Sequence, residues 1–525
     1  MSTSARTWVT AAAWAAIVGG WLAVCPAHAQ REPSEALGPE QSRPAQMYLL
    51  TDRPLYRPGD RVHFRAWELA GTLESVRSAH NVTVELLDPQ GSVAATAEVP
   101  ARDGVIAGEI ALGESFAGGR YTLRATSDLG PVETRDVVVG NYELGRLPPN
   151  IAFGRSSYAA GERVSAEVTL RDERNRPARG AAITAVVWLD GVELHSATVR
   201  SDRRGRAVVR FRLPAIIPRG DCLMTLSMRH GGLTESAQRR VPVVADRVDL
   251  AIFPEGGDLV TGLPSRVYVA AHTPLGAPLD LRAEVIDDRN QRVAEVRTSL
   301  RGMGRFRFTP EAGRTYRLRV QGPMATEIAF PTVRPNGCVL SADASGTHGL
   351  RTEVRCTDAQ TVNLRTTIRG RELARHMLSA GPRRAVARRL TLDRGQEGVV
   401  AITLSDERGP IAERLVYVAL GRGLEVSVAS NQDQFAPGDE VELVVRTRDG
   451  RGEPVAADIA LAVVDEALIS LASDRTGHIL SQLYLEPEMP GQQIADPNFY
   501  FSDDPDAAQG MDLLLGTRGW RRFRR

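Results

Sequence analysis

The 525-residue sequence contains no lysine, so all 65 of its basic side chains are arginines. They are balanced by 64 acidic residues. Removing the first 29 residues, which hold Arg6 and no acid, leaves a formal charge of zero. A chain without a basic excess has no net attraction for nucleic-acid phosphates or anionic lipid. We therefore expect no nucleic-acid partner.

Long apolar runs are also missing after residue 24, and none approaches the roughly 18 residues that a membrane span requires. The one long run, Trp8–Val24, follows Arg6 and precedes an Ala-His-Ala triplet that ends at Ala29. This order is typical of a secretory signal peptide cleaved between Ala29 and Gln30. A lipid anchor at Cys25 is an alternative, although Val24 is larger than the residue such a signal prefers. Either reading predicts an exported protein without a membrane span.

Cysteine is scarce, and only Cys222, Cys338 and Cys356 remain after such a cleavage. An odd number excludes a fully paired framework. Cys338 and Cys356 flank a stretch that reads as strand, Gly-rich turn and strand, so they could face each other across a hairpin. They are either disulfide-bonded in an oxidising compartment or two reduced, buried thiols. We expect Cys222 to be a small core residue rather than a nucleophile.

The motifs of common hydrolases are absent as well. There is no G-x-S-x-G elbow and no H-E-x-x-H pair, and the nine histidines are scattered singly. The acidic clusters at 287–288 and 503–506 lack the alternating ligands and central glycine of a calcium loop, so solvated turns are expected there. The sequence therefore predicts no catalytic residue, no metal and no cofactor, and hence not an enzyme.

What the sequence does contain is a recurring phrase: aromatic, two residues, Gly, acid, any residue, Val, any residue, apolar. It begins at Tyr56, Tyr158 and Phe435. The aromatic and the valine suit a core-facing strand start, and the glycine suits the preceding turn. The first two copies start 102 residues apart and the third 277 residues later, which leaves room for two more units. Alternating apolar stretches and frequent turns between the copies predict an all-β fold of tandem Ig-like or fibronectin-like β-sandwich domains.

We divide the chain accordingly. The segment 473–509 is rich in proline, acid and aromatics, so we expect a long exposed loop that is protease-sensitive or binds a partner. The apolar turn that follows should dock on a sandwich through Trp520 and Phe523. The expected units are a signal peptide (1–29), a linker (30–46), four β-sandwiches (47–145, 146–245, 246–333 and 334–424), the start of a fifth sandwich (425–472), and an irregular loop with the C-terminal segment (473–525).

One longer string resembles a known family. Residues 48–65 are similar to the opening of the second macroglobulin-like domain (MG2) of the alpha-2-macroglobulin and complement family. Three later segments, 253–259, 412–416 and 461–468, look like the bacterial form of that family. The matching motif consists of Thr51, Asp52, Arg53, Pro54, Tyr56, Pro58, Gly59 and Asp60.

The resemblance implies stacked macroglobulin-like domains and, in the family, a protease-cleaved bait segment followed by a thioester domain. The thioester motif C-G-E-Q is not found around Cys222, Cys338 or Cys356. The resemblance thus implies an exported, non-enzymatic protein of the periplasm or cell envelope. It would be an endopeptidase inhibitor acting sterically, or an accessory scaffold, with a protease or envelope protein as partner. The alternative is an Ig-like adhesion scaffold unrelated to proteases.

Overall fold

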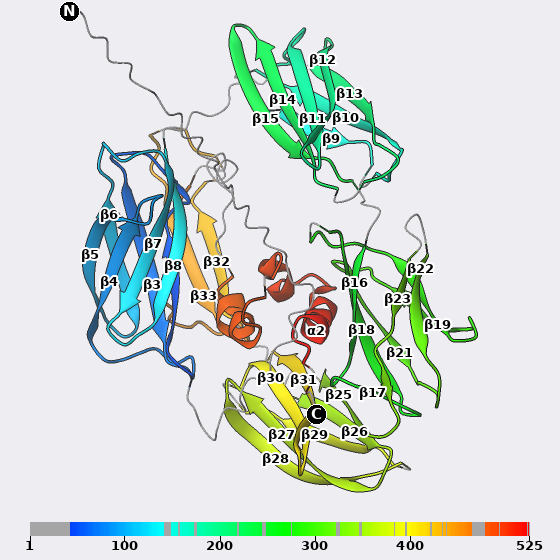
Figure 1. Ribbon diagram of the computed structural model, residues 1–525. Coiled ribbons are helices and arrows are strands. Elements are labelled where there is room, and N and C mark those ends of the chain that lie inside the picture. The colour runs from blue at the N-terminus through cyan, green and yellow to red at the C-terminus, as the bar shows by residue number, and fades with distance from the viewer. Residues whose placement is uncertain are drawn as a thin grey trace, which may run out of the picture.

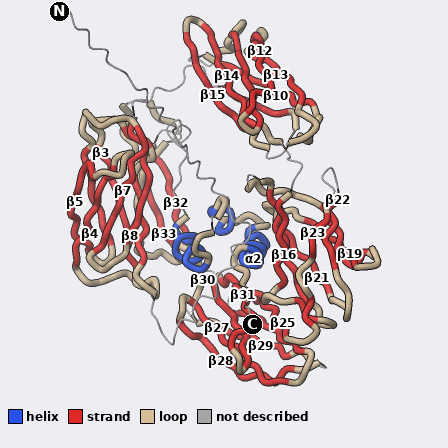
Figure 2. Tube along the Cα trace, viewed as in Figure 1, coloured by secondary structure: helices blue, strands red, loops and turns tan. Residues whose placement is uncertain are grey.

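The structure is a computed structural model, and sandwiches of β-strands surround a small group of helices in it (Figure 1). Strands dominate the fold and helices are confined to the C-terminal part (Figure 2). The signal-cleavage pair Ala29 and Gln30 and the anchor candidate Cys25 lie outside the described residues. The structure describes residues 43–523 except for 141–148, 156–157, 173–175, 218–219, 244–247, 275, 322–325, 346–348, 383, 394–395, 420–422, 433, 437, 465–477, 493 and 522.

The first sandwich packs sheet β1-β3-β6 against sheet β2-β8-β7-β4-β5. Inward and outward side chains alternate along β3, where Val62, Phe64 and Ala66 are buried. The core therefore lies between the two sheets. The strands are β1 (Gln46–Thr51), β2 (Leu55–Tyr56), β3 (Arg61–Leu69), β4 (His80–Leu87), β5 (Val93–Ala101), β6 (Val105–Ala111), β7 (Gly119–Ser127) and β8 (Val132–Val139).

The second sandwich repeats this plan with sheets β13-β10-β9 and β12-β11-β14-β15. Cys222 is buried in its core as a free thiol, as expected of a small core residue. The strands are β9 (Pro149–Phe153), β10 (Arg163–Leu170), β11 (Ala182–Leu189), β12 (Val192–Arg200), β13 (Arg206–Arg212), β14 (Cys222–His230) and β15 (Leu233–Arg240).

The third sandwich pairs sheet β16-β18-β21 with sheet β20-β19-β22-β23, and a short parallel pair, β17-β24, lies at its edge. The rings of Phe308, Tyr316 and Phe330 meet edge to face in its core. The strands are β16 (Asp249–Pro254), β17 (Leu259–Val260), β18 (Ser265–His272), β19 (Arg282–Asp287), β20 (Arg292–Arg297), β21 (Met303–Phe308), β22 (Tyr316–Gln321), β23 (Glu327–Ala329) and β24 (Val333–Arg334).

The fourth sandwich consists of sheets β25-β26-β29 and β28-β27-β30-β31. Cys338 and Cys356 are directly opposed across the β25–β26 hairpin and form a disulfide. Of the two states left open by the sequence, the structure thus contains the bonded one. The strands are β25 (Cys338–Ser345), β26 (Gly349–Cys356), β27 (Gln360–Ile368), β28 (Arg371–Ala380), β29 (Val386–Thr391), β30 (Gly398–Asp406) and β31 (Gly409–Val418).

After the fourth sandwich come a two-stranded hairpin and a helical segment. The hairpin is β32 (Glu425–Ser430) with β33 (Leu443–Arg448). The helices are η1 (Ser481–Leu485), η2 (Glu486–Glu488), η3 (Pro497–Phe501) and α2 (Ala507–Thr517). The predicted all-β class of tandem sandwiches is confirmed, while the exact unit borders stay predictions.

The recurring phrase forms the turn that starts the central strand of the smaller sheet. Tyr56 is fully buried and its hydroxyl donates to Asp52 Oδ1 at 2.6 Å. The Asp60 carboxylate accepts from the Arg57 N–H at 2.9 Å and from Arg53 at 3.0 Å, and Gly59 adopts a positive φ of 87°. The family motif therefore has a structural role: it fixes a turn and anchors it in the core.

Candidate functional site

The helical segment 478–521 lies at the centre of the molecule, between the first, third and fourth sandwiches (Figure 1). We call residues 478–521 the C-terminal plug. Its buried apolar side chains pack on the outer face of the fourth sandwich, against Val399 and Leu415 of β30 and β31. The plug residues in this cluster are Leu485, Met489, Tyr500, Met511, Leu514 and Leu515.

The prediction of a long exposed loop over 473–509 is wrong for residues 481–488 and 497–501, whereas residues 502–506 are irregular and exposed as expected. Residues 481–488 and 497–501 are helical, and Tyr500 is 6% exposed. The aromatic residues that suggested an exposed partner-binding loop instead fill the plug's own core. Residues 473–477 lie outside the described residues.

Helix α2 also contacts the third sandwich. Leu513 packs against Tyr268, Ala270 and Met303. Gly516 comes so close to the Tyr268 ring that a Cβ there would lie 2.4 Å from a ring carbon. Only glycine permits this approach, which brings the helix backbone onto the sheet.

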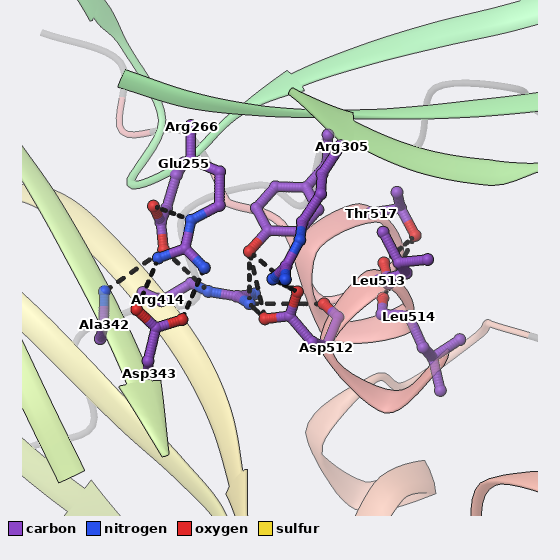
Figure 3. A network of polar contacts seen from close by, with 11 residues as sticks. Glu255, Arg266, Arg305, Ala342, Asp343, Arg414, Asp512, Leu513, Leu514 and Thr517 are labelled. Carbon is purple, nitrogen blue, oxygen red and sulfur yellow. Dashed lines mark hydrogen bonds and ion pairs between the residues drawn. The ribbon is translucent and has the colours of Figure 1, made fainter. Parts of the chain in front are cut away.

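A network of charged side chains lies beneath α2 and joins β18, β25 and β31 to the helix (Figure 3). Arg414 of β31 is at its centre. Its Nη2 donates to Asp512 Oδ1 at 2.6 Å and to the Tyr268 hydroxyl at 2.8 Å. Its Nε lies 3.3 Å from Glu255 Oε1. Arg414 thus connects the fourth sandwich to both the third sandwich and the plug.

Two further arginines complete the network. Arg266 lies 3.0 Å from Glu255 through Nε and forms a two-pronged ion pair with Asp343. Arg305 pairs with Asp512 from the other side. The alternation of acids and arginines leaves each buried charge with at least one opposite partner, which buried ions require.

Burial dominates the electrostatics of this network. The side chains of Arg414 and Glu255 are 3% and 2% exposed. Burial opposes the charge on Arg414, but Tyr268, Asp512 and Glu255 together raise the pKa of its guanidinium. Burial raises the pKa of Glu255, and the guanidiniums of Arg414 and Arg266 oppose that shift. The charges therefore depend on one another, and loss of one member affects the rest.

The end of the plug docks as the sequence predicts for Trp520. The Trp520 ring meets Phe253 edge to face at 5.6 Å, and its indole N–H donates to the Pro254 carbonyl at 2.6 Å. Arg521 pairs with Glu413 at 2.7 Å. This end of the plug is thus fixed to β16 and β31 by both stacking and charge.

The beginning of the plug reaches the first sandwich. Gln482 donates from its side chain to the Met47 carbonyl at 3.1 Å, and Glu488 pairs with Arg43 at 2.6 Å. Tyr484 donates to Glu397 of the fourth sandwich at 3.0 Å. The plug thereby links the third and fourth sandwiches to the first, which the second sandwich separates from them in the sequence.

Glu133 of β8 makes this first contact dependent on pH. Burial raises the pKa of Glu133 to about 7, and the nearby Glu486 adds to the shift. In the docked state Glu133 keeps its proton up to about pH 7, whereas a separated, solvated glutamate releases it near its ordinary pKa. Docking is therefore favoured at low pH and weakens as pH rises through about 7.

We expect residues 481–488 to exchange amide hydrogens faster at pH 8 than at pH 5, after correction for intrinsic rates. Glu133→Gln should remove most of this difference and the exposed Glu98→Gln should not; equal protection at both pH values would contradict the assignment.

The described residues contain neither a group of metal ligands nor a membrane-spanning helix. No three His, Cys, Asp or Glu side chains gather as ligands there. Within the same part of the chain, no helix is long and apolar enough to cross a bilayer.

Comparison with known proteins relates the chain to alpha-2-macroglobulins. Residues 46–139 match the family model of the MG2 domain. The alpha-2-macroglobulin of Ralstonia nicotianae is 26% identical over 151 residues, which covers 26% of this chain and 9% of that protein. Residues 46–139 thus contain an MG2 domain, and the chain is similar to alpha-2-macroglobulins. The resemblance predicted from the motif at Thr51–Asp60 is thereby confirmed.

Solved alpha-2-macroglobulin structures share the fold. The trypsin-activated protein from Escherichia coli matches with a TM-score of 0.50 at 14% identity, over 85% of this chain and 36% of that chain. The Salmonella protein reacted with methylamine covers 85% and 34%, with 14% identity and a TM-score of 0.40. This chain thus spans about a third of those structures and a much smaller part of the curated relative.

No local sequence pattern indicates the charge network. Arg414 and Asp512 are 98 residues apart, and neither lies in a pattern that indicates burial. The resemblance of segment 412–416 to bacterial relatives is the one sequence signal that includes Arg414.

Proposed function

We propose that this protein is an exported, non-enzymatic member of the alpha-2-macroglobulin family that engages endopeptidases through an exposed segment before the plug. The observation that carries the proposal is the state of residues 456–464. They form neither strand nor helix, and nearly all their side chains are exposed, with Leu461 at 54% and Val463 at 83%. An extended, accessible segment of this kind is what a protease cleft binds.

The position of this segment supports the proposal. On one side it follows β33, and residues 478–521 on the other side are packed among three sandwiches. A cut here would therefore separate the hairpin from the plug in the chain while the plug stays held by its packing and ion pairs. One structural relative is a trypsin-activated alpha-2-macroglobulin from Escherichia coli, and we extend a role for proteolysis from that protein to this chain.

The composition of the segment predicts which proteases can cut it. Between Arg451 and Arg475 there is no arginine, and the sequence contains no lysine, so trypsin has no site between these two residues. Residues 456–464 are instead rich in alanine, valine, leucine and isoleucine. We expect an elastase-type enzyme to cut first within 456–464 and trypsin to leave this segment intact.

Mass spectrometry of the fragments and size-exclusion chromatography of the mixture test the proposal together. Cleavage within 456–464, with the protease eluting in the same complex as the cleaved chain, is expected. The double variant Leu461→Asp/Val463→Asp places two carboxylates in this apolar segment, which an apolar substrate cleft disfavours, and should lower both cleavage and retention. Cleavage without retention of the protease overturns the inhibitor function and leaves the alternative, an envelope interaction scaffold.

A further inference from the structure

The hairpin β32–β33 is an incomplete copy of a sheet that the first three sandwiches have in full. In each of those, a first strand and a third strand pair with the two edges of a central strand, in the orders β1-β3-β6, β9-β10-β13 and β16-β18-β21. β33 is the equivalent of the central strands and β32 of the first strands. Along the other edge of β33, the described residues contain no third strand.

A backbone hydrogen bond fixes the equivalence residue by residue. After each central strand the chain turns back, and a backbone N–H of the turn donates to a carbonyl near the end of that strand. The three equivalent bonds are Val76 to Glu68, Ala178 to Leu170 and Leu279 to Ala271, at 3.0–3.2 Å. Val455 donates to Thr447 in the same way at 3.2 Å. Thr447 therefore corresponds to Leu170. Two and four residues earlier, Val445 and Leu443 correspond to Val168 and Ala166. Both of these residues of the second sandwich are fully buried.

The side chains of the hairpin show that a covering layer is missing. Tyr56 and Tyr158, which begin the recurring phrase in the first two sandwiches, are 0% and 2% exposed, whereas Phe435 is 36% exposed. Val62 and Val164 are buried, but Val441 is 48% exposed. Val428, directly opposite Val445, is 53% exposed. A face that forms core elsewhere is open here, so its residues retain an apolar surface that another strand could cover.

The three complete sheets define what fits this edge. Each third strand begins with a glycine of positive φ, namely Gly104, Gly205 or Gly302, whose carbonyl accepts from the central strand. A Cβ on any of them would come within 2.6 Å of the carbonyl that corresponds to Thr447 O. In the hairpin this place is open: a surface hollow is lined by Thr447, Val455 and their neighbours.

The residues after that glycine follow a common pattern. Inward-facing apolar residues or glycines stand two, four and six positions later, as in Ala207, Val209 and Phe211 of β13. The strand runs antiparallel to the central strand in all three cases. Residues 481–488, 497–501 and 507–517 of the plug do not supply such a strand, because they are helical and pack on the other sandwiches.

We propose that the free edge of β33 binds an extended segment of a separate polypeptide as an added antiparallel β-strand. The segment starts with a glycine opposite Thr447 and carries apolar side chains two, four and six residues later. This is strand addition, in which main-chain hydrogen bonds supply affinity and alternate side chains supply specificity. It differs from the proposed protease function, since its hydrogen bonds come from the edge of β33, although Ala456 at the start of the segment 456–464 also lines the hollow.

The chain itself provides the probe. A fluorescein-labelled peptide with the sequence of residues 201–213 contains the glycine and the alternating apolar residues of β13. Its matched control carries Gly205→Val, which keeps the charge but places side-chain atoms against the Thr447 carbonyl. We expect fluorescence anisotropy to show saturable binding of the first peptide to the full chain, and at least tenfold weaker binding of the second.

A variant of the hairpin tests the edge. The Leu170 N–H donates to the third strand at Gly205 O, so the Val445 N–H, two residues before the corresponding Thr447, points to the free edge. Val445→Pro removes this donor without removing a bond to β32, whereas Val445→Thr keeps it. The proline variant should lose peptide binding and the threonine variant should retain it.

Three results would overturn the proposal. One is equal binding of the Gly205→Val peptide, a comparison that does not depend on how Val445→Pro folds. Another is unchanged binding by Val445→Pro. The third is a dimer of the full chain in analytical ultracentrifugation that Val445→Pro dissociates, because a second copy would then occupy the edge.

Discussion

Replacing Arg414 with methionine is expected to lower the free energy of opening of helix α2 by about 3 kcal/mol. Arg414 is 3% exposed and contacts Asp512, Tyr268 and Glu255. Methionine fills similar volume but leaves two acids with one partner fewer. Breaking a buried ion pair costs about 3–5 kcal/mol, and the lower end applies because Arg305 and Arg266 still neutralise the acids.

Hydrogen exchange followed by mass spectrometry measures this effect locally, which suits a multidomain chain without a single unfolding transition. Protection of residues 507–517 should fall by about two orders of magnitude, since each tenfold change corresponds to about 1.4 kcal/mol. Arg375→Met is the matched control. Arg375 pairs with Glu372 at the surface, where such a pair contributes about 0–1 kcal/mol. Equal protection in the two variants would show that the network does not hold the plug.

A second large effect is expected from Gly516→Val. The new Cβ would lie 2.4 Å from the ring of Tyr268, which is fully buried and has no room to turn away. Overpacking of this kind costs about 1–3 kcal/mol, and we expect the upper end because the ring also holds its hydroxyl against Arg414 and Asp512. The helix must therefore move off β18, and the charge network opens with it.

The same substitution at an exposed position of the same helix is the control. Ala508→Val introduces the same side chain where Ala508 is exposed. It lowers helix propensity slightly, whereas Gly516→Val raises it, so propensity alone would favour α2 in the Gly516 variant. Near-ultraviolet circular dichroism of the buried aromatics and exchange of residues 507–517 should change strongly in Gly516→Val and little in Ala508→Val. If both variants behave alike, close contact between α2 and β18 is not what secures the plug.

The strand architecture could be predicted from the sequence because its signals are local. The phrase around Tyr56 and Tyr158 sets a turn, an anchor and an alternating strand within nine residues, and the structure places both tyrosines in the core. The same phrase at Phe435 predicts a core residue as well, yet Phe435 is 36% exposed. A local pattern indicates which face of a strand is apolar, but it does not indicate whether another sheet or segment covers that face.

The plug could not be predicted for a related reason. Its first three helices have only three to five residues, two of them begin next to Pro487 or at Pro497, and such short turns lack a helical period. Proline, acid and aromatic residues then looked like an exposed loop. The sequence did indicate the docking of Trp520, since a large aromatic side chain next to an apolar turn is stabilised by burial against a neighbouring domain.

The central claim is that residues 478–521 form a docked plug that joins the first, third and fourth sandwiches. The most direct test is amide exchange of the unmodified full chain, comparing α2 with the hairpin β32–β33. The account predicts slow exchange in residues 507–517, as in β30 and β31, and much faster exchange in residues 425–430 and 443–448. Exchange of α2 as fast as that of the hairpin would contradict it.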